Sequence, residues 1–82
     1  MLIDVKLPEL GEDAGKEATV SFWYVEEGGE IKKDEDLVEM VTDKATFNVP
    51  SPAGGVVREI KALEGDKIEV GQLMAVIEGG EG

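Results

Sequence analysis

The chain matches itself at an offset of 37 residues, and this internal repeat is the feature that most constrains its fold. The matched pairs are Val20 with Val57, Val25 with Ala62, Glu27 with Glu64, Gly28 with Gly65, Ile31 with Ile68, Leu37 with Met74, and Met40 with Ile77. Each half is too small to bury its own apolar face, so the simplest arrangement packs the two halves on each other. The repeat therefore predicts a flattened barrel or a sandwich.

The composition favours an all-β domain. Eleven glycines, three prolines and several short runs rich in Val, Ile and Leu are typical of short strands joined by turns. A chain of 82 residues forms one small domain, which buries only about 60% of the surface that its unfolded chain exposes, so no deep substrate cleft is expected. Strands are predicted at residues 3–7, 19–25, 37–42, 45–49, 56–62 and 73–78. The polar segment 11–16 is predicted as a surface loop, and the domain is expected to occupy residues 1–78 with a flexible linker beginning at 79–82.

The residue types exclude several classes of function. The sequence has no cysteine and no histidine, so it lacks the commonest general base, the usual zinc ligands and both familiar nucleophile arrangements. This argues against a self-sufficient enzyme, and no metal site is predicted. The acidic run Asp34-Glu35-Asp36 lacks the ligand spacing of a calcium loop and is predicted as a solvated turn.

The charge balance narrows the choice of partners and location. Nineteen acidic and eight basic residues give a net charge of -11, which repels phosphate backbones and anionic lipids. No nucleic acid or membrane partner is therefore expected. No apolar stretch approaches the ~18 residues of a membrane span, and no basic segment leads into an apolar one at the amino terminus. We expect a cytoplasmic location, or the mitochondrial matrix in a eukaryote.

A hairpin with Asp43 and Lys44 at its centre explains how apolar residues are spaced between residues 38 and 49. Opposed residues then have numbers that sum to about 87, following the geometry of a two-residue turn. This register places four apolar side chains on one face, namely Val38, Met40, Phe47 and Val49. The short carboxylate of Asp43 can bond backbone donors, but the pair lacks glycine, so the turn type stays open. Lys44 lies at the tip, where a lysine is usually only a solvated charge.

The residues around this turn form longer motifs. They are Val41-Thr42-Asp43-Lys44-Ala45-Thr46, Val49-Pro50-Ser51-Pro52 and Gly54-Gly55-Val56-Val57. These motifs resemble the lipoyl domain family, specifically the lipoyl domains of dihydrolipoyl acyltransferases of 2-oxo acid dehydrogenase complexes. The opening Leu7-Pro8-Glu9-Leu10-Gly11-Glu12 and the segments 25–31 and 71–78 are similar to the same family. The resemblance covers essentially the whole chain.

The resemblance implies a fold and an attachment site. The fold is a flattened β-barrel of two four-stranded sheets with approximate two-fold symmetry, a barrel-sandwich hybrid. Lipoic acid is joined by an amide to Lys44, and Asp43 and Ala45 belong to the turn that the modifying enzyme recognises. Related biotinyl carriers have methionine on both sides of their lysine, so Asp43 and Ala45 favour lipoate. Val41 and Asn48 lack carboxylates that are common near this turn in the family, which changes the charge that a ligase or a dehydrogenase meets.

The function implied is that of a non-catalytic carrier. Lipoyl-Lys44 acts as a swinging arm that moves acyl groups and reducing equivalents between the active sites of a 2-oxo acid dehydrogenase complex, with the pyruvate dehydrogenase type favoured. The implied partners are a lipoate ligase or lipoyl transferase, a thiamin-diphosphate-dependent dehydrogenase, an acyltransferase catalytic domain and dihydrolipoyl dehydrogenase. Two alternatives stay open: a biotinyl carrier domain of a carboxylase, and an unmodified acidic interaction module.

Overall fold

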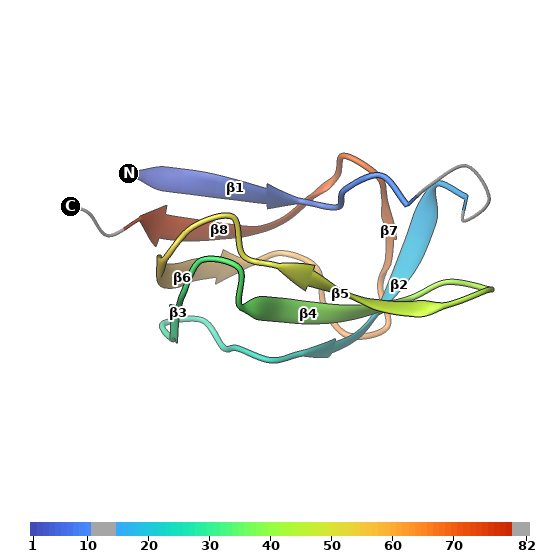
Figure 1. Ribbon diagram of the computed structural model, residues 1–82, viewed down its shortest axis with the longest axis horizontal. Helices are drawn as coiled ribbons and strands as arrows, with labels where there is room; N and C mark the ends of the chain where they lie inside the picture. Colours follow the sequence, from blue (N-terminus) through green and yellow to red (C-terminus); the bar gives the residue numbers. More distant parts are fainter. Residues whose placement is uncertain (11–14, 80–82) are drawn as a thin grey trace.

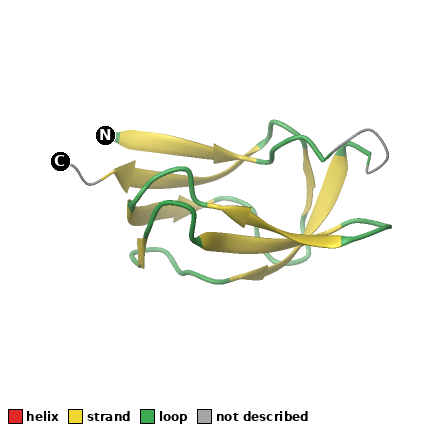
Figure 2. Cartoon of the chain, viewed as in Figure 1, coloured by secondary structure: helices red, strands yellow, loops and turns green. Residues whose placement is uncertain are grey.

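The computed structural model describes residues 1–10 and 15–79, and these residues form an all-β fold (Figure 2). The eight strands are β1 (Leu2–Lys6), β2 (Glu17–Trp23), β3 (Glu30–Ile31), β4 (Asp36–Val41), β5 (Thr46–Pro50), β6 (Gly55–Ile60), β7 (Lys67–Glu69) and β8 (Leu73–Gly79). They pair antiparallel in two four-stranded sheets, ordered β1-β8-β6-β3 and β5-β4-β2-β7. The predicted two-sheet class is confirmed, although the sheets do not close into a strict barrel. No helix capable of crossing a membrane is present in the part of the chain that the structure describes.

The internal repeat is expressed as exchanged hydrogen bonds between the two halves. Gly28 N–H donates to the Val57 carbonyl over 2.7 Å, and Gly65 N–H donates to the Val20 carbonyl over 2.8 Å. The two donors, Gly28 and Gly65, are 37 residues apart, and so are the two acceptors, Val20 and Val57. The bond that the first half donates to the second is therefore matched by the bond that the second half donates to the first. The approximate two-fold symmetry predicted from the sequence is therefore present in the backbone network.

One apolar core lies between the sheets, and the hairpin of β4 and β5 supplies part of it. The observed register pairs Met40 with Phe47 and Val38 with Val49, as predicted. Val38 and Met40 are fully buried, Val49 is nearly so, and Phe47 is half-buried against the same core. Burial of this apolar face fixes the register, because a slip of one residue would turn every side chain of the strand to the other face.

Two strands were not among the six predicted from the sequence. β3 has two residues and β7 has three, too few for an alternating pattern to be recognised. Each nevertheless buries one isoleucine, Ile31 in β3 and Ile68 in β7, and the two residues are again 37 apart. The sequence repeat therefore held the signal for both strands, although the local pattern did not.

The last strand includes the first residue of the predicted linker. Gly79, expected to begin a flexible linker, is the last residue of β8, and its N–H donates to the Met1 carbonyl over 2.7 Å. This bond joins the end of β8 to the residue that precedes β1. The rest of that predicted linker, residues 80–82, and most of the predicted loop, residues 11–14, lie outside the described residues.

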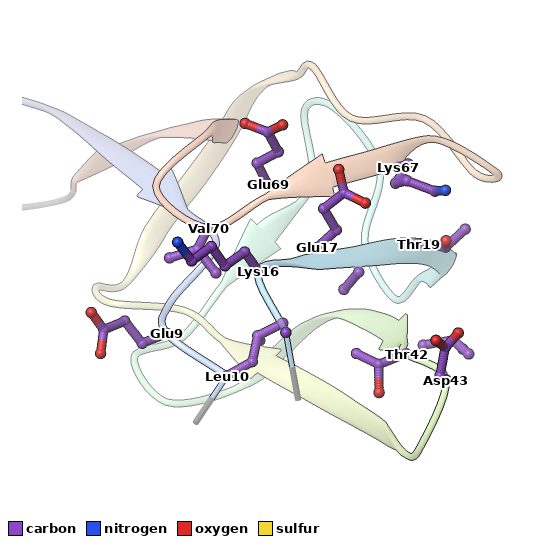
Figure 3. Close-up of a pocket in the computed structure, with 13 residues that line it drawn as sticks. Glu9, Leu10, Lys16, Glu17, Thr19, Thr42, Asp43, Lys67, Glu69 and Val70 are labelled. Carbon is purple, nitrogen blue, oxygen red and sulfur yellow. The ribbon is translucent and has the colours of Figure 1, made fainter. Parts of the chain in front are cut away.

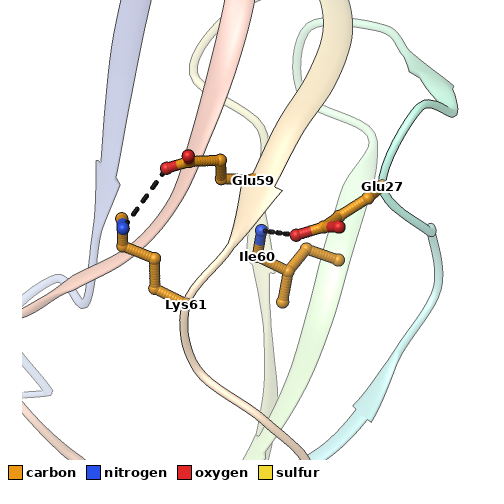
Figure 4. Close-up of polar contacts among 4 residues, drawn as sticks. All are labelled: Glu27, Glu59, Ile60 and Lys61. Carbon is orange, nitrogen blue, oxygen red and sulfur yellow. Dashed lines mark hydrogen bonds and ion pairs between the residues drawn. The ribbon is translucent and has the colours of Figure 1, made fainter.

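Two side chains on or just after β2 bond the backbone of β6 or the segment after it. The indole N–H of the half-buried Trp23 donates to the Ala62 carbonyl over 2.7 Å. A Glu27 carboxylate oxygen accepts a hydrogen bond of 2.8 Å from the N–H of Ile60, the last residue of β6 (Figure 4). Such bonds satisfy backbone and indole donors that the ladders leave unpaired. They hold β2 and the segment after it against the opposite sheet.

Gly55 is expected to be intolerant of a side chain, unlike its neighbour Gly54. A Cβ at Gly55 would overlap the Glu78 carbonyl oxygen of the paired strand, whereas a Cβ at Gly54 would meet its nearest atom at an ordinary 3.6 Å. Gly55→Ala should lower the free energy of unfolding by about 2 kcal/mol through overpacking, and Gly54→Ala by less than about 0.5 kcal/mol. Urea unfolding followed by circular dichroism measures both. Equal effects would contradict the close approach of β6 to β8.

Candidate functional site

The hairpin of β4 and β5 ends at one extremity of the molecule. The body measures 39 × 21 × 18 Å, and Figure 1 shows the hairpin tip at one end of the long axis with the start of β1 and the end of β8 toward the other. Val41 and Thr46 form the last strand pair, so residues 42–45 make the connection. Lys44 is exposed in this connection, as the register predicted.

The turn is built by the hydroxyl of Thr42. Its Oγ accepts hydrogen bonds from Lys44 N–H (3.2 Å) and Ala45 N–H (3.1 Å) and lies 3.2 Å from the Ala45 carbonyl, to which Thr42 N–H also donates (2.8 Å). Neither Asp43 nor Lys44 has a positive φ, so the turn is not of the primed types that dominate two-residue hairpins. Sequence reasoning assigned the capping role to Asp43. Threonine at the first turn position was the signal for this hydroxyl-capped turn.

This arrangement gives Lys44 a fixed root and a free amine. The backbone of Lys44 is held by the Thr42 hydroxyl, while the side chain lies in solvent. The ion pairs within the described residues are Arg58 with Glu78 and Lys61 with Glu59, so Lys44 forms none there. An exposed amine at a projecting tip is accessible to an enzyme that acylates it. Asp43 and Ala45, the other two predicted site residues, flank it in the same turn and are also exposed.

An open groove of about 1030 Å³ lies beside the turn (Figure 3). The segment after β1, the start of β2, the end of β4 with its turn, and β7 line it. Its lining residues are Glu9, Leu10, Gly15, Lys16, Glu17, Ala18, Thr19, Val41, Thr42, Asp43, Lys67, Glu69 and Val70. Sequence reasoning missed the groove because these segments are distant in the chain. Its lining of carboxylates, two lysines, hydroxyls and small apolar groups offers a contact surface, not a catalytic set.

The outer face of the sheet β5-β4-β2-β7 carries two exposed aromatic side chains next to carboxylates. Phe22 and Tyr24 are 48% and 45% exposed, and their rings meet edge to face with centroids 5.2 Å apart. The Tyr24 hydroxyl lies 3.1 Å from Asn48 Oδ1 and 3.4 Å from Glu39 Oε1, and the Asn48 amide donates to Asp36 over 3.0 Å. Loss of water around the phenol, together with the negative charges of Glu39 and Asp36, raises the pKa of Tyr24 above its ordinary value. We refer to these five residues as the aromatic face.

Comparison with protein families places this geometry among known domains. The model of the family described as "Biotin-requiring enzyme" matches residues 3–77. The succinyltransferase component of the 2-oxoglutarate dehydrogenase complex of Bartonella vinsonii subsp. berkhoffii is 45% identical over 80 residues, which are 98% of this chain and 19% of that protein. The acetyltransferase component of the pyruvate dehydrogenase complex of Corynebacterium glutamicum is 43% identical over 77 residues, 94% of this chain and 11% of that protein. The chain thus spans about a fifth or less of these relatives.

Solved structures show the same fold. The lipoyl domain of the 2-oxoglutarate dehydrogenase complex of Azotobacter vinelandii superposes with a TM-score of 0.74 at 38% identity, covering 95% of this chain and 99% of that one. Kluyveromyces lactis urea carboxylase superposes with a TM-score of 0.70 at 22% identity, covering 93% of this chain and 7% of that one. The second likeness shows the fold alone.

Proposed function

The chain belongs to the biotinyl/lipoyl domain family, and from that premise we propose that it is a lipoyl carrier whose lipoic acid is joined by an amide to Lys44. The observation that carries the proposal is the exposed Lys44 amine at the tip of a hairpin with a capped turn. Asp43 and Ala45 flank it as in the lipoyl motif, and the hairpin register turns Val38, Met40 and Val49 into the core.

The residues of the turn fit this attachment. Amide formation links the Lys44 nitrogen to the carboxyl carbon of lipoate, with loss of the ammonium charge and of the group that activated the carboxyl. The bound dithiolane supplies a site that accepts an acyl group together with two electrons. The Thr42 hydroxyl holds the root of the arm while the lysine side chain lies in solvent. A tethered arm of this kind raises the effective concentration of its cargo at each active site.

The two residues beside Lys44 distinguish attachment of lipoate from attachment of biotin. Asp43 and Ala45 stand where biotinyl carriers have methionines, which supports lipoate. Lipoate ligase with lipoic acid should raise the intact mass by one lipoyl group, and biotin ligase with biotin should give no avidin-captured product. Capture by avidin would instead support a carboxylase carrier. A free Lys44 in native, lipoate-replete material would support an unmodified interaction module.

The type of complex is a finer proposal, and we favour the pyruvate dehydrogenase type. The relatives include both succinyltransferase and acetyltransferase components, at 45% and 43% identity, so identity does not separate the two. Reductive acylation of the lipoylated domain by a pyruvate dehydrogenase and by a 2-oxoglutarate dehydrogenase, assayed side by side, tests the choice. A larger kcat/KM with the 2-oxoglutarate enzyme would assign the domain to the succinyl type. The acyltransferase domain and dihydrolipoyl dehydrogenase then complete the proposed set of partners.

A further inference from the structure

A bulge in β2 puts the aromatic face on the outside of the molecule. Ala18 and Val20 are buried, so simple alternation would also turn Phe22 and Tyr24 into the core. The pairing of β2 with β4 shifts between Val20 and Phe22, and beyond the shift Trp23 packs against the core instead. A bulge commonly re-aims a side chain in this way. Two aromatic rings are thereby exposed, although the core beneath them is complete without them.

The carboxylates beside the rings are held in place but not neutralised. Asp36 and Glu39 lie within hydrogen-bond distance of the neutral groups of Asn48 and Tyr24, and neither forms an ion pair within the described residues. The chain as a whole carries a net charge of -11. A cationic partner therefore gains electrostatically on approach. Because the network already fixes the Tyr24 ring, little side-chain freedom is lost on contact.

The chemistry of the aromatic face fits a guanidinium group. A planar guanidinium stacks on an aromatic ring and forms forked hydrogen bonds with a carboxylate, whereas a lysine ammonium is a compact and more strongly hydrated charge. Aromatic side chains are also enriched among the residues that carry binding energy at interfaces. Rings and carboxylates side by side therefore match arginine more closely than any neutral group.

The position of the aromatic face suits a partner that also uses the arm. Phe22 pairs with Glu39, which lies on β4 five residues before Lys44. At about 3.3 Å per residue, Glu39 is roughly 7 Å from the end of β4 at Val41, and the turn that holds Lys44 follows directly. Val41 and Thr46 lie between the aromatic face and the turn, on the same outer face of the hairpin. A partner bound at the aromatic face leaves the tip of the hairpin free to enter an active site.

We propose that the aromatic face docks an arginine-bearing surface of the dehydrogenase that acylates the lipoyl arm, an inference that rests on the proposed function. On that function the acyltransferase is part of the same chain as the domain, as in the relatives, so their encounter is already favoured by the tether. On the same function the dehydrogenase is a different polypeptide, so no covalent tether favours its encounter with the domain. A specific docking surface is therefore needed most for this partner.

Reductive acylation by whichever dehydrogenase gives the larger kcat/KM in the side-by-side assay tests the docking surface. The lipoylated Phe22→Ser/Tyr24→Ser variant should show a KM at least about tenfold higher with an unchanged kcat, the loss expected when interface anchors are removed. Asp36→Asn/Glu39→Gln, which keeps side-chain size, should reduce the dependence of KM on salt. Leu63→Ser is the matched control, because Leu63 is 62% exposed and lies outside the aromatic face. Its KM should equal that of the wild type.

The outcomes separate the two proposals. A wild-type domain that is not lipoylated or not acylated would refute the proposed function and the inference with it. Normal acylation of the wild type with an unchanged KM in the aromatic variant would overturn the inference alone. Slower lipoylation of the aromatic variant with an unchanged KM for acylation would also overturn it and assign the face to the ligase. Matching urea midpoints of the variants and the wild type show that the fold is intact.

Discussion

Lys44→Ala and Lys44→Arg are both expected to abolish lipoylation completely. Alanine removes the amine, and arginine keeps the positive charge at the tip but has no side-chain amine that loses its proton to act as a nucleophile. Intact mass after treatment with lipoate ligase and lipoic acid should therefore stay that of the unmodified chain. Lys33→Ala is the matched control, since Lys33 is another exposed lysine next to an aspartate in a turn.

Comparing the arginine and alanine variants shows whether Lys44 itself is the lysine that receives the lipoyl group. If charge at the tip were sufficient for recognition and another lysine were the acceptor, Lys44→Arg would still gain one lipoyl group. Peptide mapping would then find the modified lysine elsewhere. Full modification of Lys33→Ala together with none in either Lys44 variant assigns the attachment to the hairpin tip.

Leu37→Ala is expected to lower the free energy of unfolding by about 3 kcal/mol or more, because a fully buried leucine leaves both a transfer loss and a cavity. A domain of this size has a total stability of only about 4–12 kcal/mol, so the loss is a large fraction of it. Urea unfolding monitored by circular dichroism gives the difference directly. The melting temperature should fall by about 4–8 °C for each kcal/mol lost.

Leu63→Ala controls for the loss of a leucine as such. Leu63 is 62% exposed, so its truncation should change the free energy of unfolding by less than about 0.5 kcal/mol. An equally small effect at Leu37 would mean that the contacts between the two sheets do not determine stability. The same comparison separates core packing from changes in the unfolded chain.

The parts of the molecule that depend on periodicity were predictable from the sequence. The 37-residue offset predicted two packed halves, and the apolar faces of β4 and β5 predicted their register with Lys44 at the tip. Capping by Thr42 was not predicted. Threonine at the first turn position is a signal for it, but Asp43 could bond the same backbone, and the backbone conformation selects between the two. The aromatic face was not predicted either. It depends on one extra residue in β2, which reverses the alternation beyond Val20.

The two chain ends and the hairpin tip are related by the same symmetry. Gly79 N–H bonds the Met1 carbonyl as Thr42 N–H bonds the Ala45 carbonyl, so residues 1 and 79 meet where a second turn would otherwise close the other half. The end of β8 therefore lies at the opposite end of the 39 Å axis from the hairpin tip that carries Lys44 (Figure 1). A rotation of the rigid body about the end formed by residues 1 and 79 would move the lysine through an arc far wider than the side chain alone can cover.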